Sequence, residues 1–294
     1  MKIGAFELPD SLPDCNEPYV LAVLRPWIDV NNVGTLVLKE LAARFEAVEL
    51  GGLSKPGRFY DFTRYRPVVH LEDGIRGMSI PNTTIRYAKR EGQNDLLLLR
   101  LLEPHVNAEL YIGSVLKLFR VFKAKKYILL GSMYDTVPHT RPLLVNGYGM
   151  GEDAARDVKK TGVLPITYRG PSSIANLITK EAAASGIEAI VFIVSLPQYV
   201  VLEEDYAGKL RLMELLNALY GIPIAKEDIE KALDQHDAIN ERLGNSPEVK
   251  ILMPQLEKVY DARMRSIERE GMPSLSPEME ELFWKISGKD IGRA

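Results

Sequence analysis

The sequence predicts an α/β protein, specifically a three-layer α/β/α sandwich around a mostly parallel, mixed sheet. Two observations predict this class. Short apolar runs of strand length alternate with amphipathic stretches of helix length over most of the chain. The apolar runs are continuous, which is typical of strands covered on both faces. We therefore expect one α/β/α domain over residues 1–222 and a helical C-terminal extension over residues 223–294.

The predicted strands follow from the apolar runs and from one hairpin pattern. The run at 19–24 contains no charged residue and ends before Pro26, which cannot continue a central strand. The Asp73-Gly74 pair separates two β-rich segments, as in a hairpin turn that adds an antiparallel element. The stretch 131–151, which contains several glycines, is predicted to be a long, flexible loop. The expected strands are 19–24, 66–71, 75–80, 95–102, 127–130 and 187–195.

The predicted helices follow from apolar residues spaced three and four positions apart. Asn31-Asn32 stands just before the first helix and is predicted to cap it. No strand pattern remains from Pro223 onward. This segment contains eleven Lys and Arg residues and fifteen Asp and Glu residues, so it is acidic. The apolar stripes of this acidic tail must be buried on the core domain or on another subunit. The expected helices are 33–45, 108–122, 172–184, 203–220, 229–243 and 249–267, with a last one beginning at 276–278.

Composition excludes several classes of protein. The formal net charge is -3, so no basic field favours a nucleic-acid partner. The single cysteine, Cys15, cannot form an internal disulfide or a cysteine-based zinc site. The longest uninterrupted apolar runs have six residues, whereas a membrane span needs about twenty. We expect a cytoplasmic protein with no membrane and no nucleic-acid partner.

Familiar catalytic and metal-binding motifs are absent from the sequence. The chain has no phosphate-binding loop of the Gly-x-x-x-x-Gly-Lys-Ser/Thr type. Its four histidines never fall three or four residues apart, so no paired metal ligands are recognisable. His236 lies on the apolar stripe of a tail helix, where we expect it to be packed. We expect no catalytic residues, no metal and no cofactor.

Polar side chains nevertheless gather where the predicted strands end, which is where open α/β sheets bind ligands. Arg141 is suited to bidentate binding of a carboxylate or phosphate, and Glu103 or His139 to proton exchange. The alternative is that Arg141 and Glu103 form a structural ion pair that holds the loop. The candidate ligand-binding residues are Asn31, Asn32, Arg66, Glu103, His139, Thr140 and Arg141.

Several short motifs, in their order along residues 19–220, resemble the PAC2 family of proteasome assembly chaperone 2-like proteins. These motifs are Asn31-Asn32-Val33-Gly34, Phe59-Tyr60-Asp61-Phe62 ahead of Arg66-Pro67, Glu103-Pro104, Thr140-Arg141-Pro142, Gly170-Pro171-Ser172 and Pro197-Gln198-Tyr199-Val200. The resemblance implies a topology related to purine nucleoside phosphorylases, homo-oligomers, and no established catalytic residues. The helical tail looks like the extension of bacterial members.

The resemblance also implies a role in assembling or binding 20S proteasomes, as characterised members do. Some archaeal members dock through a C-terminal hydrophobic-Tyr-X motif, but the last residues here, 290–294, are Asp-Ile-Gly-Arg-Ala. We therefore expect no docking through that motif.

Two functional hypotheses remain open at the level of the sequence. The first is a non-catalytic, self-associating assembly protein. The alternative is a binding protein or enzyme for a nucleoside or phosphorylated metabolite, with Arg25, Arg66 and Arg141 as candidate phosphate ligands.

Overall fold

Four parallel strands form the centre of the sheet in the computed structural model, which describes residues 1–72 and 74–266. Their order is β8 (Leu96–Leu102), β3 (Tyr19–Arg25), β9 (Lys126–Asp135) and β12 (Glu188–Pro197). All four were predicted from their apolar runs. Because the strands are parallel, their carboxyl ends lie at one edge of the sheet.

Antiparallel strands extend this parallel centre on both sides. Next to β8 lie β7 (Thr84–Ala88), β4 (Val48–Leu53), β2 (Phe6–Glu7) and β1 (Lys2–Ile3). On the other side, β12 pairs with β10 (Val145–Met150), and β10 pairs in parallel with β11 (Leu164–Pro165). The main sheet formed by the described residues is therefore mixed and has ten strands, and none of its outer strands was predicted.

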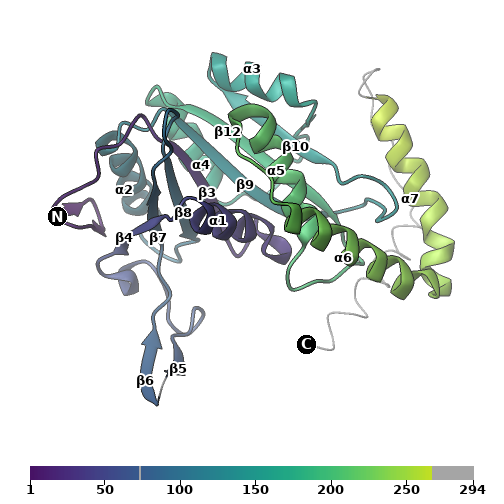
Figure 1. Cartoon of the computed structure of the whole chain (residues 1–294), viewed down its shortest axis with the longest axis horizontal. Coiled ribbons are helices and arrows are strands. Elements are labelled where there is room, and N and C mark those ends of the chain that lie inside the picture. The colour runs from purple at the N-terminus through teal and green to yellow at the C-terminus, as the bar shows by residue number, and fades with distance from the viewer. Residues whose placement is uncertain (73, 267–294) are drawn as a thin grey trace.

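Helices cover both faces of the sheet (Figure 1). In β3, Val20, Ala22 and Leu24 belong to the core shared with α2 (Ala108–Val121) and α4 (Ile174–Ala184). The alternate residues Leu21 and Val23 belong to the core shared with α1 (Val33–Arg44) and α5 (Tyr206–Tyr220). A strand buried on both faces in this way confirms the predicted three-layer α/β/α sandwich.

The predicted long loop over 131–151 is wrong. Strand β9 continues to Asp135, and β10 occupies most of the glycine-rich segment, followed by α3 (Glu152–Thr161). The glycines here permit close packing: a Cβ on Gly149 would lie 2.4 Å from backbone atoms of Ala154. Helix α3 was missed because it is strongly charged and buries only Ala154.

The predicted hairpin is confirmed as β5 (Val68–Glu72) and β6 (Ile75–Ser79), but it does not join the main sheet. It forms a separate two-stranded sheet that projects from the body of the molecule (Figure 1). We call residues 68–80 the arm; within it, Asp73 lies outside the described residues. Short 3-10 turns at Val30–Asn32 and Pro56–Arg58 complete the core domain.

Two tail helices, α6 (Lys226–Gly244) and α7 (Pro247–Ser266), follow the core domain. Leu252 and Leu256 of α7 pack against Tyr199 and Val200, so at least this stripe is buried on the chain's own core. Helix α6 is attached through buried Asp228, which binds Lys209 of α5.

The predicted apolar stripe of α6 is exposed in its first half, whereas Ile239 and Leu243 pack against the cluster of Tyr199 and Leu252. Ile229 and Leu233 are 41% and 59% accessible, and His236 is exposed, so the prediction of a packed histidine is wrong. The predicted helix start at 276–278 and the final residues 290–294 lie outside the described residues. Across residues 1–72 and 74–266, no helix is long and apolar enough to span a membrane.

Candidate functional site at the carboxyl edge of the sheet

The predicted site residues lie at the carboxyl edge of the parallel strands, but in two separate clusters. Arg25 ends β3 and Glu103 directly follows β8, on the side of the arm. Asp135 ends β9, and the loop after it carries the predicted residues His139, Thr140 and Arg141 toward α7. The edge therefore contains one pocket near the arm and one polar contact with the tail.

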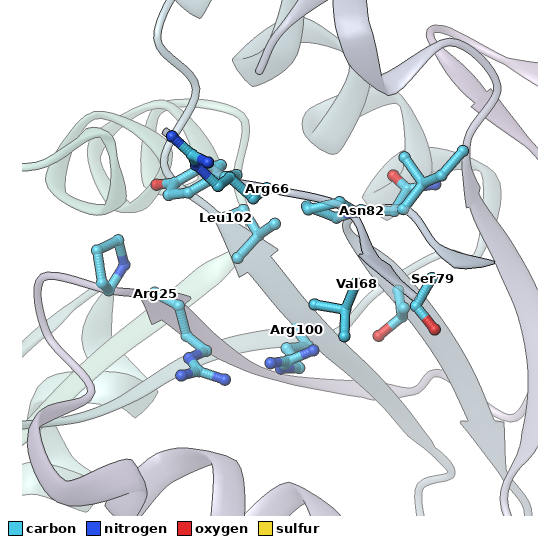
Figure 2. Close-up of a pocket in the computed structure, with 12 residues that line it drawn as sticks. Arg25, Arg66, Val68, Ser79, Asn82, Arg100 and Leu102 are labelled. Carbon is cyan, nitrogen blue, oxygen red and sulfur yellow. The ribbon is translucent and has the colours of Figure 1, made fainter. Parts of the chain in front are cut away.

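The pocket lies between the carboxyl ends of β3 and β8 and the base of the arm. It has a volume of about 430 Å³. Arg25, Arg66 and Arg100 line it, and we call it the arginine pocket. Figure 2 shows the guanidinium groups of Arg25 and Arg100 on the same side of the pocket, with Arg66 at the opposite side. The remaining lining residues are Pro26, Tyr65, Val68, Ser79, Ile80, Pro81, Asn82, Thr84 and Leu102.

Arg100 occupies an unfavourable electrostatic environment. It interrupts an otherwise all-leucine strand, and its buried Nε has no hydrogen-bond partner among the described residues. Burial lowers the pKa of Arg100 from its usual value, repulsion from Arg25 lowers it further, and the Asp29 carboxylate acts in the opposite direction. An arginine stays protonated at physiological pH, so Arg100 keeps its positive charge in this partly buried position.

The only carboxylate that forms an ion pair with these three arginines, within the described part of the chain, is Asp29. Its Oδ2 lies 3.7 Å from Arg25 Nε. The same carboxylate is already occupied at the start of α1: it accepts hydrogen bonds from the amides of Gly34 and Thr35 and from the Thr35 hydroxyl. Burial raises the pKa of Asp29, although those hydrogen bonds and Arg25 act in the opposite direction.

Asn31 and Asn32 do not cap α1 with their side chains, contrary to prediction. Both adopt left-handed backbone conformations, with φ of 51° and 57°. The Asn31 Oδ1 accepts a hydrogen bond from the hydroxyl of Tyr134, and the Asn32 amide donates to the carbonyl of Glu203. These asparagines hold the β9 end and the segment before α5 together, while Asp29 performs the capping.

Glu103 does not pair with Arg141, so the predicted ion pair is wrong. Its Oε1 accepts a hydrogen bond from the amide of Ile174 at 3.0 Å, which caps α4. Its Oε2 is buried and has no partner among the residues described. Burial raises the pKa of Glu103 against the opposing effect of the Ile174 amide.

The second cluster joins the loop after β9 to α7. Arg141 binds Glu257 and Asp261 of α7, with N–O distances of 3.2 and 3.3 Å. The Thr140 hydroxyl donates to Glu257 Oε1 at 2.5 Å. His139 Nδ1 lies 2.8 Å from the hydroxyl of Tyr199. Arg141 is therefore engaged in holding the tail and does not reach the arginine pocket.

A network of hydrogen bonds extends this contact into the sheet. We call the whole contact the tail latch; it joins residues 135–141, Asn146, Ser195 and Tyr199 to Glu257, Asp261 and Arg263 of α7. Asp135 accepts hydrogen bonds from Ser195 Oγ and from Arg263 Nη1, both at 2.8 Å. Asn146 accepts from Arg263 and donates to Ser195. Sequence reasoning missed Asp135 and Arg263 because 128 residues separate the two partners.

The described residues show neither a metal centre nor a reactive cysteine. Within the described residues, no group of three or more His, Cys, Asp or Glu side chains is placed to hold a metal ion. Burial raises the pKa of the Cys15 thiol to about 11, which disfavours the reactive thiolate. What the arginine pocket can do chemically is to bind negative charge.

Comparison with known proteins identifies the family of this chain. The family model described as "PAC2 family" matches residues 23–243. The chain belongs to the PAC2 family. No curated protein matches its sequence.

Solved structures share the fold. A Mycobacterium tuberculosis protein of unknown function is 22% identical with a TM-score of 0.79, covering 98% of each chain. A proteasome-assembly chaperone homologue of the same organism is 22% identical with a TM-score of 0.71, covering 79% of this chain and 98% of that one. The archaeal proteasome activator PbaB of Pyrococcus furiosus is 16% identical with a TM-score of 0.62, covering 80% of this chain and 97% of that one.

Proposed function

We propose that this chain is a non-catalytic, cytoplasmic assembly protein that associates with itself and binds a further protein complex. Membership of the PAC2 family supports this role, and the proteasome is the natural candidate for the complex. Solved structures of the same fold include a proteasome-assembly chaperone homologue and an archaeal proteasome activator. The arginine pocket contains no carboxylate, histidine or cysteine in its lining, which also favours binding over catalysis.

The observation that carries the proposal is the apolar surface of the arm. Leu71 and Ile75 are 72% and 74% accessible, and Val68 and Met78 are both 61% accessible. A two-stranded hairpin alone is marginally stable in water, and concentrated exposed apolar side chains mark interaction surfaces. The exposed stripe on α6, with Ile229 and Leu233, provides a second unpartnered surface on the same chain. One self-complementary surface is enough for a two-fold dimer, so a second exposed surface leaves room for a further partner.

Light scattering after size-exclusion chromatography tests the self-association. We expect the full chain to elute as an oligomer and the double variant Leu71→Glu/Met78→Glu to elute at a lower mass. The matched control is Leu177→Glu on α4, which adds a charge at another exposed apolar position and should leave the mass unchanged. A monomeric wild-type chain at all accessible concentrations would remove the self-association part of the proposal.

Co-expression with the 20S α and β subunits of its own organism tests the proteasome part. We expect co-purification of a defined assembly intermediate with the wild-type chain and loss of it with the arm variant. Repeated absence of 20S subunits would remove the proteasome as the partner complex.

The sequence also left a small-molecule binding protein open, and one observation favours that role: Arg25 and Arg66, two of the three candidate phosphate ligands, line the same pocket.

A further inference from the structure

The positive charge of the arginine pocket has little compensation from acidic side chains among the described residues. Three guanidinium groups line one cavity that contains no acidic lining residue. Of the three arginines, only Arg25 forms an ion pair with Asp29, at 3.7 Å. Two other buried or partly buried cations have close carboxylate partners, Lys209 with Asp228 and Arg263 with Asp135, while buried Arg90 donates to the carbonyl of Tyr220. The pocket therefore differs from those close ion pairs: Arg66 and Arg100 have no carboxylate partner in the part of the chain that the structure describes, and Arg25 has only a distant one.

The environment of Arg100 is expected to lower the stability of the ligand-free protein. Arg100 is partly buried, and its buried, unpartnered Nε costs stability because the desolvation of that atom is not offset by a hydrogen bond. In the parallel register Arg100 lies opposite Val23, so it shares a face of the sheet with Arg25 two residues further on. A negative ligand placed between these side chains would offset both the desolvation and the mutual repulsion.

We propose that the arginine pocket is a binding site for a small organic phosphate, with the phosphate held by Arg25 and Arg100 and closed over by Arg66. Arginine is suited to this role because its planar donors bind phosphate oxygens in pairs. Leu102, Val68 and Ile80 supply apolar walls for the organic part of the ligand. The volume of about 430 Å³ lies within the usual range of small-molecule pockets and exceeds what a bare phosphate ion needs.

The position of the site connects the ligand to the arm. Val68 of β5 and Ser79 of β6 both line the pocket, so a bound ligand contacts the two strands where they leave the body. The site stands independently of the proposed assembly function, since phosphate binding is measured on the isolated chain whatever its oligomeric state.

Isothermal titration calorimetry of the full chain tests the site, with inorganic phosphate, phenyl phosphate and benzoate as probes in 150 mM salt. We expect phenyl phosphate to bind several-fold more tightly than inorganic phosphate, because its ring meets the apolar walls. Benzoate, which offers a single negative charge, should bind at least tenfold more weakly than phenyl phosphate. Equal binding of benzoate and phenyl phosphate would overturn the phosphate assignment in favour of a carboxylate ligand.

Substitutions separate a built site from nonspecific attraction. Arg100→Met should weaken phenyl phosphate binding by about tenfold or more, and it should raise the melting temperature of the ligand-free protein by removing an uncompensated charge. Exposed Arg66→Gln should weaken binding several-fold without changing stability. Arg120→Gln, which removes one exposed positive charge on α2, is the matched control and should change neither.

Amide hydrogen exchange shows where the ligand binds, because a nonspecific effect of ionic strength would not slow exchange at the base of the arm alone. Phenyl phosphate should slow amide exchange at both strands of the arm base, around residues 66–69 and 78–82, in the wild type and not in Arg100→Met. The proposal is overturned if phenyl phosphate fails to bind at millimolar concentration, or if it binds wild type and Arg100→Met alike.

Discussion

Arg263 Nη1 donates a hydrogen bond to Asp135 Oδ2 at 2.8 Å, joining the last described turns of α7 to the carboxyl end of β9. Burial opposes ionisation of Asp135, but the Arg263 hydrogen bond and charge, together with Ser195 and the Thr136 amide, outweigh it and hold the pKa of Asp135 below its usual value. The tail is therefore held at the candidate site edge by a charged pair that is mostly shielded from water, with side-chain accessibilities of 19% and 30%.

Removing either member of this pair should loosen α7. In a double-mutant cycle of Arg263→Met and Asp135→Asn, we expect a coupling energy of about 1 to 2 kcal/mol, since close partly buried pairs couple in this range. The measurement is urea unfolding, with amide exchange along α7 as the local readout. Arg156→Met breaks an exposed pair with Asp153 and should cost less than about 0.5 kcal/mol. Additive effects of the two latch substitutions would show that the pair does not couple the tail to the sheet.

The same latch should weaken in mild acid through His139. Burial lowers the pKa of His139, the nearby His236 adds to this, and Glu257 acts in the opposite direction. The unfolded chain, in which a histidine titrates near 6.5, then binds more protons than the folded chain between the lowered value and 6.5. The stabilisation is complete above pH 6.5 and is lost as the pH falls from 6.5 through the lowered folded value.

We therefore expect the exchange of α7 amides to speed up between pH 7 and pH 5.5 in the wild type, after correction for intrinsic exchange. His139→Gln should flatten this dependence. His70→Gln on the arm serves as the control and should retain it, because His70 lies away from the latch. An unchanged pH dependence in His139→Gln would contradict the assignment.

The central parallel strands could be predicted because their sequences are continuous apolar runs. The outer strands lack such runs and were missed. The run at residues 19–24 and strand β12 are buried on both faces, so burial alone determines their composition. Strand β10 contains Gly147 and Gly149 because neighbouring backbone lies too close for a side chain. That requirement comes from tertiary packing and leaves no strand pattern in the sequence, which is why a loop was predicted.

The candidate site was predictable in its location and only partly in its residues. Arg25 and Arg66 were named as candidate phosphate ligands, and both line one pocket. Arg100 was missed, although a single charge within an otherwise all-leucine strand is a recognisable signal of a functional or paired residue. Arg141 was assigned to the same site, but its partners are Glu257 and Asp261, whose proximity depends on how the tail folds back.

The start of α1 gives the clearest test of sequence reasoning against structure. The pattern favoured Asn31-Asn32 as the cap, whereas buried Asp29 accepts the hydrogen bonds from Gly34 and Thr35. Asp29→Ala should lower the free energy of unfolding by about 2 to 4 kcal/mol, because it leaves buried donors at a helix start without an acceptor.

Asn32→Gly is the matched substitution for the other interpretation. Glycine tolerates the φ of 57° at this position, so the only loss is the exposed hydrogen bond to the Glu203 carbonyl, and we expect a cost below about 1 kcal/mol. Urea unfolding of both variants shows which of them loses more free energy of unfolding. If Asn32→Gly proved the more damaging of the two, the asparagine would be the effective cap and the role assigned to Asp29 would be wrong.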